Sequence, residues 1–177
     1  MPLFVAFLRG INVGGRTVKK EVLQEVFASL GLQNVSTYKQ SGNVVFETNA
    51  PNIEGLLKKI EARLRAILGY EVPVLLRSIE QLKGIVELDV FKGQNQEGLS
   101  FLVTFLPVRI TPFPEQLPLT IPKSTAQVIS ATDTEVFSVT HGGGEGALPN
   151  PFIESKLKVK ATTRNLNIIR EIVEKFG

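Results

Sequence analysis

The sequence predicts an α+β fold made of two ferredoxin-like subdomains, residues 1–77 and 78–177, packed as one compact unit. The first 77 residues place strand and helix patterns in the order βαββαβ, which is the ferredoxin-like order, known also as the alpha-beta plait. Two pairs of strand patterns flank short turn sequences, which indicates antiparallel pairing. The second half contains enough strand and helix patterns for a degenerate copy of the first.

The chain begins with a strand and a glycine-rich loop. Residues 3–8 are apolar at every position, as in a strand buried on both faces. Residues 10–16 form the loop, and Thr17 is expected to cap a helix that continues to Leu30. Gly31 should end this helix in the left-handed conformation.

A hairpin and a second helix complete the first half. Residues 35–48 alternate as two strands around a turn at 39–43. The next helix carries one apolar face and ends at Gly69. A strand follows over residues 72–76, and Pro73 places this strand at a sheet edge or itself among the first residues of the strand.

The second half is less regular. Ser78 and Gln81 form a capping box for a helix that ends near residue 87. An apolar strand covers residues 100–106, a connection with five prolines covers residues 107–122, and a hairpin covers residues 126–140.

Two helices are predicted near the carboxyl end. Asn150 is expected to cap a short helix that has Pro151 at its first position. The last helix should run from about Arg164 to Phe176, with the preceding threonines as its cap. Arg164 would then lie at the positive end of the helix dipole, which hints at an acidic partner in the protein or in a ligand.

Composition excludes several classes of function. The chain has 177 residues, of which 43% are hydrophobic and 21% charged, with a net charge of +3. It has no cysteine, which excludes disulfides and thiolate chemistry and fits a cytoplasmic protein. Its single histidine excludes a multi-histidine metal site within one chain. We expect no metal and no cofactor. No apolar run is long enough to span a membrane, and no secretion signal is visible at the amino terminus.

The loop at residues 10–17, GINVGGRT, nearly matches the P-loop pattern of nucleotide hydrolases, but Arg16 replaces the lysine. A planar arginine does not substitute for the compact lysine charge that bridges the phosphates. A P-loop also belongs to a parallel sheet, whereas the sheet predicted here is antiparallel. A weaker function is open to the loop, because glycines before a helix start can hold an anion with backbone N–H groups. The alternative is a plain connection in which the glycines only provide positive φ.

Three motifs resemble an uncharacterised bacterial family, the domain of unknown function 1697 family. They are LRGINVGG at residues 8–15, YKQSGNVVF at 38–46, and SKL at 155–157 followed by ATTRNLN at 161–167. The resemblance covers essentially the whole chain. It implies a fold of two ferredoxin-like subdomains and transfers no established activity.

The polar residues of these motifs are the candidate ligand-binding residues: Arg9, Asn12, Gly14, Gly15, Arg16, Gln40, Ser41, Asn43, Arg164 and Asn165. We expect the first loop and the hairpin turn to lie at opposite ends of the sheet, so that they do not share a pocket. The hairpin residues also make a good turn by themselves, and Arg164 also suits a structural salt bridge. Lys156 is expected to be solvated, and His141 would suit a general base but lacks an identifiable partner.

The leading hypothesis is a protein that binds a small anionic (phosphorylated) ligand at loop 9–17. RNA binding is an alternative, because some ferredoxin-like sheets stack bases on strand aromatics. The RNA-recognition signature is absent, and Phe46 is expected in the core. A protein-interaction module without a ligand is the third hypothesis. No reaction, oligomeric state or ligand identity follows from the sequence.

Overall fold

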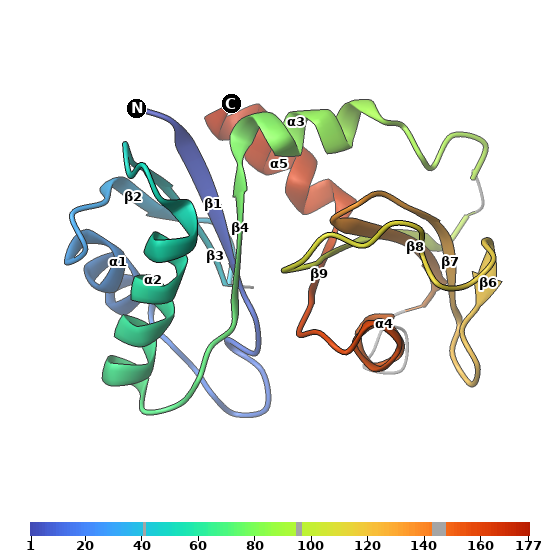
Figure 1. Ribbon diagram of the computed structural model, residues 1–177, viewed down its shortest axis with the longest axis horizontal. Coiled ribbons are helices and arrows are strands. Elements are labelled where there is room, and N and C mark those ends of the chain that lie inside the picture. The colour runs from blue at the N-terminus through green and yellow to red at the C-terminus, as the bar shows by residue number, and fades with distance from the viewer. Residues whose placement is uncertain (41, 95–96, 143–147) are drawn as a thin grey trace. The chain divides into compact units, whose positions relative to one another are not determined.

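The computed structural model describes residues 1–40, 42–94, 97–142 and 148–177. Over these residues the chain is a mixed α+β protein with five helices and two antiparallel sheets (Figure 1). It divides into two compact units, Met1–Leu82 with Gly177, and Lys83–Phe176. The division falls a few residues after the boundary that we placed at residue 77.

The first unit contains one sheet and two helices. Its strands are β1 (Leu3–Leu8), β2 (Gln33–Thr37), β3 (Asn43–Glu47) and β4 (Val74–Ser78), and its helices are α1 (Lys20–Ala28) and α2 (Ile53–Leu68). The strands lie in the order β2-β3-β1-β4, and every pair is antiparallel. Strand β4 lies at a sheet edge and begins directly after Pro73, as the sequence predicts.

The core of this unit lies between the sheet and the two helices, which cover the same face (Figure 1). Phe46 is fully buried there, as expected, and its ring centroid lies 5.5 Å from that of Phe27 on α1. Ile60 and Leu64 bring the apolar face of α2 into the same cluster. The spacing of these residues therefore explains why the helices dock on the sheet.

The two helices begin differently. Helix α2 has the expected ends, because the Asn52 side chain accepts a hydrogen bond from the N–H of Gly55 and Gly69 is left-handed. The prediction that Thr17 caps α1 is wrong. The N–H of Val18 donates instead to the Asn12 side chain, and Lys19, which is extended, precedes the first helical residue without any side-chain cap.

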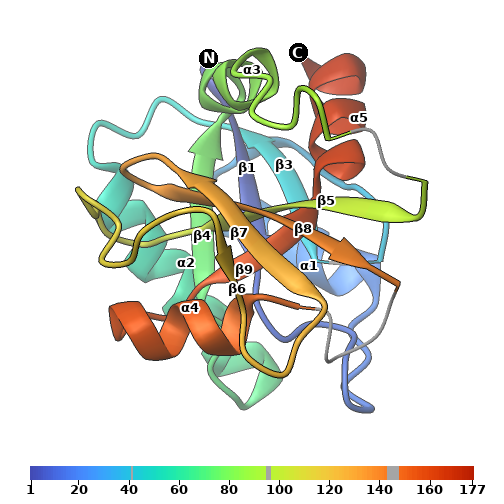
Figure 2. The same ribbon diagram turned by 90° about the vertical axis from the view of Figure 1, so that its right-hand side faces the viewer.

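The second unit contains the other sheet. Its strands are β5 (Leu99–Phe105), β6 (Leu119–Thr120), β7 (Ala126–Ala131), β8 (Glu135–His141) and β9 (Thr162–Asn165), and its helices are α4 (Asn150–Leu157) and α5 (Leu166–Phe176). Helix α3 (Ile79–Glu87) has the predicted capping box and crosses the division between the units. The strand order is β6-β7-β8-β5-β9, and Figure 2 shows β7, β8 and β5 side by side. Ile153 of α4 is fully buried with Val128 and Val136 of this sheet.

Two predictions in this unit are wrong. Arg164 lies on strand β9, opposite Val103 of β5, and not in the first turn of the last helix, so the argument from the helix dipole fails. Asn150 does not cap α4. Its amide donates to the carbonyl of Ala161 and its oxygen accepts from the Thr163 hydroxyl, so it joins the helix to strand β9.

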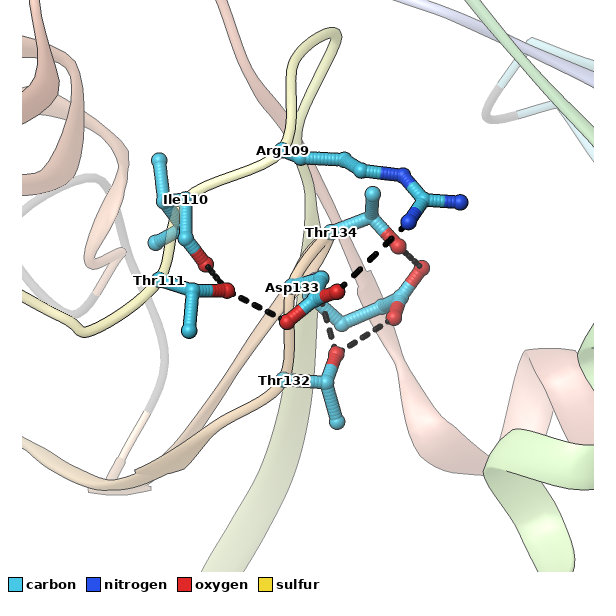
Figure 3. A network of polar contacts seen from close by, with 7 residues as sticks. Arg109, Ile110, Thr111, Thr132, Asp133 and Thr134 are labelled. Atoms are coloured by element: carbon cyan, nitrogen blue, oxygen red, sulfur yellow. Dashed lines mark hydrogen bonds and ion pairs between the residues drawn. The ribbon is translucent and has the colours of Figure 1, made fainter.

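The proline-rich connection between β5 and β7 is fastened to the turn of the β7–β8 hairpin (Figure 3). The Thr111 hydroxyl donates to Asp133 at 2.5 Å, and the guanidinium of Arg109 lies 3.8 Å from the same carboxylate. Beside it, the buried carboxylate of Glu135 accepts from the hydroxyls of Thr132 and Thr134. These contacts hold an irregular segment that has little backbone pairing of its own.

Candidate functional site

The loop after β1 and the turn between β2 and β3 lie at the same end of the first sheet. Because β1 and β3 are antiparallel, Phe7 near the end of β1 pairs with Asn43 at the start of β3. Our expectation that the two segments lie at opposite ends is therefore wrong. A strand that runs antiparallel to its neighbour starts where that neighbour ends, and this geometry brings the two segments together.

Asn12 joins three segments at this end of the sheet. Its amide donates to the carbonyl of Gln40 at 2.7 Å, and its oxygen accepts from the N–H of Val18 at 2.8 Å. Its φ of 57° is left-handed, a conformation that asparagine adopts more readily than most residues. One side chain thus links the glycine loop, the hairpin turn and the start of α1.

The glycines of the loop allow backbone conformations with positive φ. Gly10, Gly14 and Gly15 all have positive φ, and a Cβ at any of them would meet no atom within 4 Å. Gly42 in the hairpin is different. A Cβ there would lie 3.1 Å from the carbonyl oxygen of Leu8 and 3.2 Å from the Cβ of Ile11, so the close approach of turn and loop also requires a glycine.

A cavity of about 540 Å³ opens between the loop, the start of α1 and the hairpin. The described residues that line it all belong to the first unit: Asn12, Thr17, Val18, Lys19, Lys20, Glu21, Leu23, Thr37, Lys39, Gln40, Gly42 and Asn43. Val18 and Leu23 are buried and give the cavity an apolar part.

The charges around the cavity are mostly positive. Among the described lining residues, Lys19, Lys20 and Lys39 are basic and one, Glu21, is acidic. Lys20 and Glu21 form an exposed ion pair at 3.9 Å, a distance and exposure at which pairing is weak. The positive end of the α1 dipole adds to this field, and two lysines at a helix start are unfavourable unless an anion compensates them.

The structure brings together part of the predicted set. Asn12, Gln40 and Asn43 line the cavity, and the Asn43 amide also donates to the carbonyl of Tyr38 at 3.0 Å, so it holds the turn. Ser41 lies outside the described residues.

The two arginines of the loop do not belong to the described lining of the cavity. The backbone N–H of Arg9 donates to the carbonyl of Pro73. The guanidinium of Arg16 stacks on the Tyr70 ring at 4.5 Å, which is the geometry of a cation–π contact. Gly14 and Gly15 are exposed between these arginines.

Arg164 and Asn165 belong to the second unit. Arg164 is buried and donates to the Thr162 hydroxyl at 2.8 Å and to the carbonyl of Thr163 at 2.9 Å. Burial lowers its pKa to about 10, because desolvation disfavours the charged form. The Asn165 oxygen accepts from the N–H of Asn167, which places Asn165 at the start of α5 as a capping residue.

Other candidate groups have separate surroundings. His141 is exposed and lines a smaller cavity of about 230 Å³ beside Gln94 and Thr125. Lys156, expected to be solvated, pairs with Glu115 at 2.5 Å. Within the described ranges, no group of three or more histidine, aspartate or glutamate side chains could hold a metal ion, and none of the helices is long and apolar enough to cross a bilayer.

Sequence reasoning missed the lysines of the cavity, although a signal was present. Lys19 and Lys20 stand at a helix start, where cations oppose the dipole. We applied that argument to Arg164, where the helix boundary was misplaced. Applied to residues 19 and 20, it would have pointed to an anionic partner for α1.

Comparison with known proteins agrees with the resemblance in the sequence motifs. A conserved bacterial protein, SP0830 from Streptococcus pneumoniae, has a similar solved structure, with a TM-score of 0.66 and 20% sequence identity. The alignment covers 98% of this chain and 97% of that one, and at this identity it shows a shared fold. No curated protein matches the chain significantly. The model of a family described as a protein of unknown function, DUF1697, matches residues 1–137, and the chain therefore belongs to this family.

Proposed function

We propose that the protein binds a small anionic ligand, such as a phosphorylated metabolite, in the cavity between the glycine loop and the β2–β3 hairpin. The observation that carries this proposal is that Lys19, Lys20 and Lys39 all line one cavity at the start of α1, where no side chain caps the helix. Helix starts attract anions through their free N–H groups and dipole, and lysines supply the compensating charge.

The proposal keeps the location that the sequence suggested and changes the residues. Asn12, Gln40 and Asn43 shape the cavity, whereas the lysines supply the charge that we first assigned to Arg9 and Arg16. The hydrogen bonds of the Asn12 side chain favour a preorganised site, because they already join the loop to the hairpin turn and to the start of α1 without a ligand. The site differs from a P-loop, since β1 is antiparallel to both of its neighbours.

We infer in addition that both units are ferredoxin-like. The first unit has the order βαββαβ with sheet order β2-β3-β1-β4. In the second unit, β5, β7, β8, α4 and β9 take the corresponding places, with sheet order β7-β8-β5-β9. The proline-rich connection with β6 replaces the first helix, which explains why this half appears degenerate in the sequence.

The alternatives have less support. The aromatics Phe7 and Phe46 on the central strands of the first sheet are fully buried, so this sheet offers RNA no stacking surface at these positions. A protein-interaction module without a ligand would leave the lysine cavity unexplained. A cytoplasmic location is part of the proposal, because it rests on the absence of cysteine.

Calorimetric titration with inorganic phosphate at low ionic strength tests the proposal. The variant Lys39→Gln should bind about fivefold more weakly, since a lost contact between unit charges in water is worth about 1 kcal/mol. The matched control is Lys59→Gln, which removes an exposed lysine of α2 that does not line the cavity. Equal weakening by both variants would mean that only the overall charge matters, and it would refute a specific site.

A further inference from the structure

The residues that line the cavity indicate a narrower class of ligand than the positive charge alone does. We propose that the ligand is a phosphomonoester of a small polyhydroxylated compound, such as a sugar phosphate, with its hydroxyls bound to Glu21 and to the neutral polar side chains of the cavity. This inference rests on the proposed function and specifies its substrate class.

The cavity is larger than a bare inorganic anion requires. A volume of about 540 Å³ lies within the range of about 300–1,000 Å³ typical of small-molecule sites. One phosphate group would fill a fraction of this space. The lysines at the start of α1 and Lys39 account for the anionic part, and the remaining lining must accommodate an uncharged organic part.

The rest of the lining suits hydroxyl groups. Thr37 and Gln40 come from the hairpin side and offer donors and acceptors. Glu21 is the one acidic side chain of the described lining, and its carboxylate accepts hydrogen bonds only. A carboxylate repels a bare phosphate, but it binds the hydroxyls of a neighbouring polyol strongly. Its presence among lysines therefore favours a ligand that carries both groups.

The same lining disfavours nucleotides. None of its described residues is aromatic, and proteins commonly hold nucleobases by stacking them on aromatic rings. A nucleoside monophosphate should therefore gain nothing beyond the binding of its phosphate.

Calorimetry with three probes tests this inference: inorganic phosphate, glucose 6-phosphate and adenosine 5′-monophosphate. We expect glucose 6-phosphate to bind at least about tenfold more tightly than phosphate, as two added hydrogen bonds would give, and the nucleotide to bind like phosphate. Glu21→Gln should strengthen phosphate binding, because it removes a repulsion, and should shrink the preference for glucose 6-phosphate. Glu25→Gln removes an exposed carboxylate of the same helix outside the described lining, and it should leave that preference unchanged.

The outcomes separate the two claims. If no probe binds, the proposed function fails. If phosphate binds but glucose 6-phosphate binds no more tightly, or if the nucleotide binds most tightly, the anion site stands and the polyhydroxylated class is refuted. A preference for glucose 6-phosphate that Glu21→Gln does not reduce would also contradict the role of this carboxylate. A preference that only the Glu21 variant reduces would support the inference.

Discussion

Replacement of Asn12 by glycine and by alanine tests how the glycine loop is held. Both variants lose the bonds from the Asn12 side chain to the carbonyl of Gln40 and the N–H of Val18. They differ in backbone preference, because residue 12 has a φ of 57°. Glycine adopts this conformation without strain, whereas alanine does not.

The expected magnitudes follow from these two effects. A net contribution of about 0.5–1.5 kcal/mol for each hydrogen bond predicts that Asn12→Gly lowers the free energy of unfolding by about 1–3 kcal/mol. Asn12→Ala should lower it by about 1 kcal/mol more, from the strain of the left-handed conformation. Asn34→Gly is a matched control, because Asn34 is also left-handed but makes one exposed bond, to Glu47. Asn34→Gly should lower the free energy of unfolding by less than about 1 kcal/mol.

Urea unfolding followed by circular dichroism measures these differences. We expect the wild type to be the most stable, followed by Asn34→Gly, then Asn12→Gly, and Asn12→Ala to be the least stable. An Asn12→Gly variant as stable as the Asn34 control would refute the claim that Asn12 fastens the loop. Equal stability of the glycine and alanine variants would contradict the assigned backbone conformation.

Three further predictions concern other parts of the chain. Gly42→Ala should lower the free energy of unfolding, measured by thermal unfolding, by about 2 kcal/mol or more. Gly31→Ala should lower it by about 1 kcal/mol, because Gly31 also has a positive φ but a Cβ there would meet no atom within 4 Å. Equal losses would contradict the close approach of the turn and the loop at Gly42. Thr111→Val should lower the free energy of unfolding by about 1 kcal/mol through the lost bond to Asp133, and limited proteolysis should then cut the proline-rich connection sooner. Because burial lowers the pKa of Arg164 to about 10, the unfolded chain binds more protons than the folded chain above that pH. The difference in the free energy of unfolding between the wild type and Arg164→Met should therefore be constant below about pH 9 and should rise in favour of the wild type above pH 10. A decrease of this difference above pH 10 would contradict the desolvation of Arg164.

The sequence predicted most elements of the first unit because local signals agreed there with the tertiary packing. The ends of α2 followed from the chemistry of Asn52 and Gly69, and both have the expected conformations. The start of α1 was misplaced because Val18 bonds to the Asn12 side chain, an interaction that no local pattern encodes. Strand β9 was missed for a similar reason: its short run of polar residues looks like a helix cap until β5 pairs with it.

The candidate site depended on topology as well as on residue types. The loop and the hairpin turn were both identified, but their meeting follows from the antiparallel pairing of β1 with β3. The lysines of the cavity carry no motif, and their convergence requires the three-dimensional path of two separate segments. Such sites become visible only when the ends of the strands are placed in space.

Amide chemical shifts of the isotope-labelled protein during titration with inorganic phosphate test the anion site most directly. We expect the largest shifts at residues 17–21 and at Thr37, Lys39, Gln40, Gly42 and Asn43, where the start of α1 and the hairpin line the cavity. They should saturate together with one dissociation constant. Shifts centred instead on the exposed lysines of α2, or on the second unit, would contradict the account.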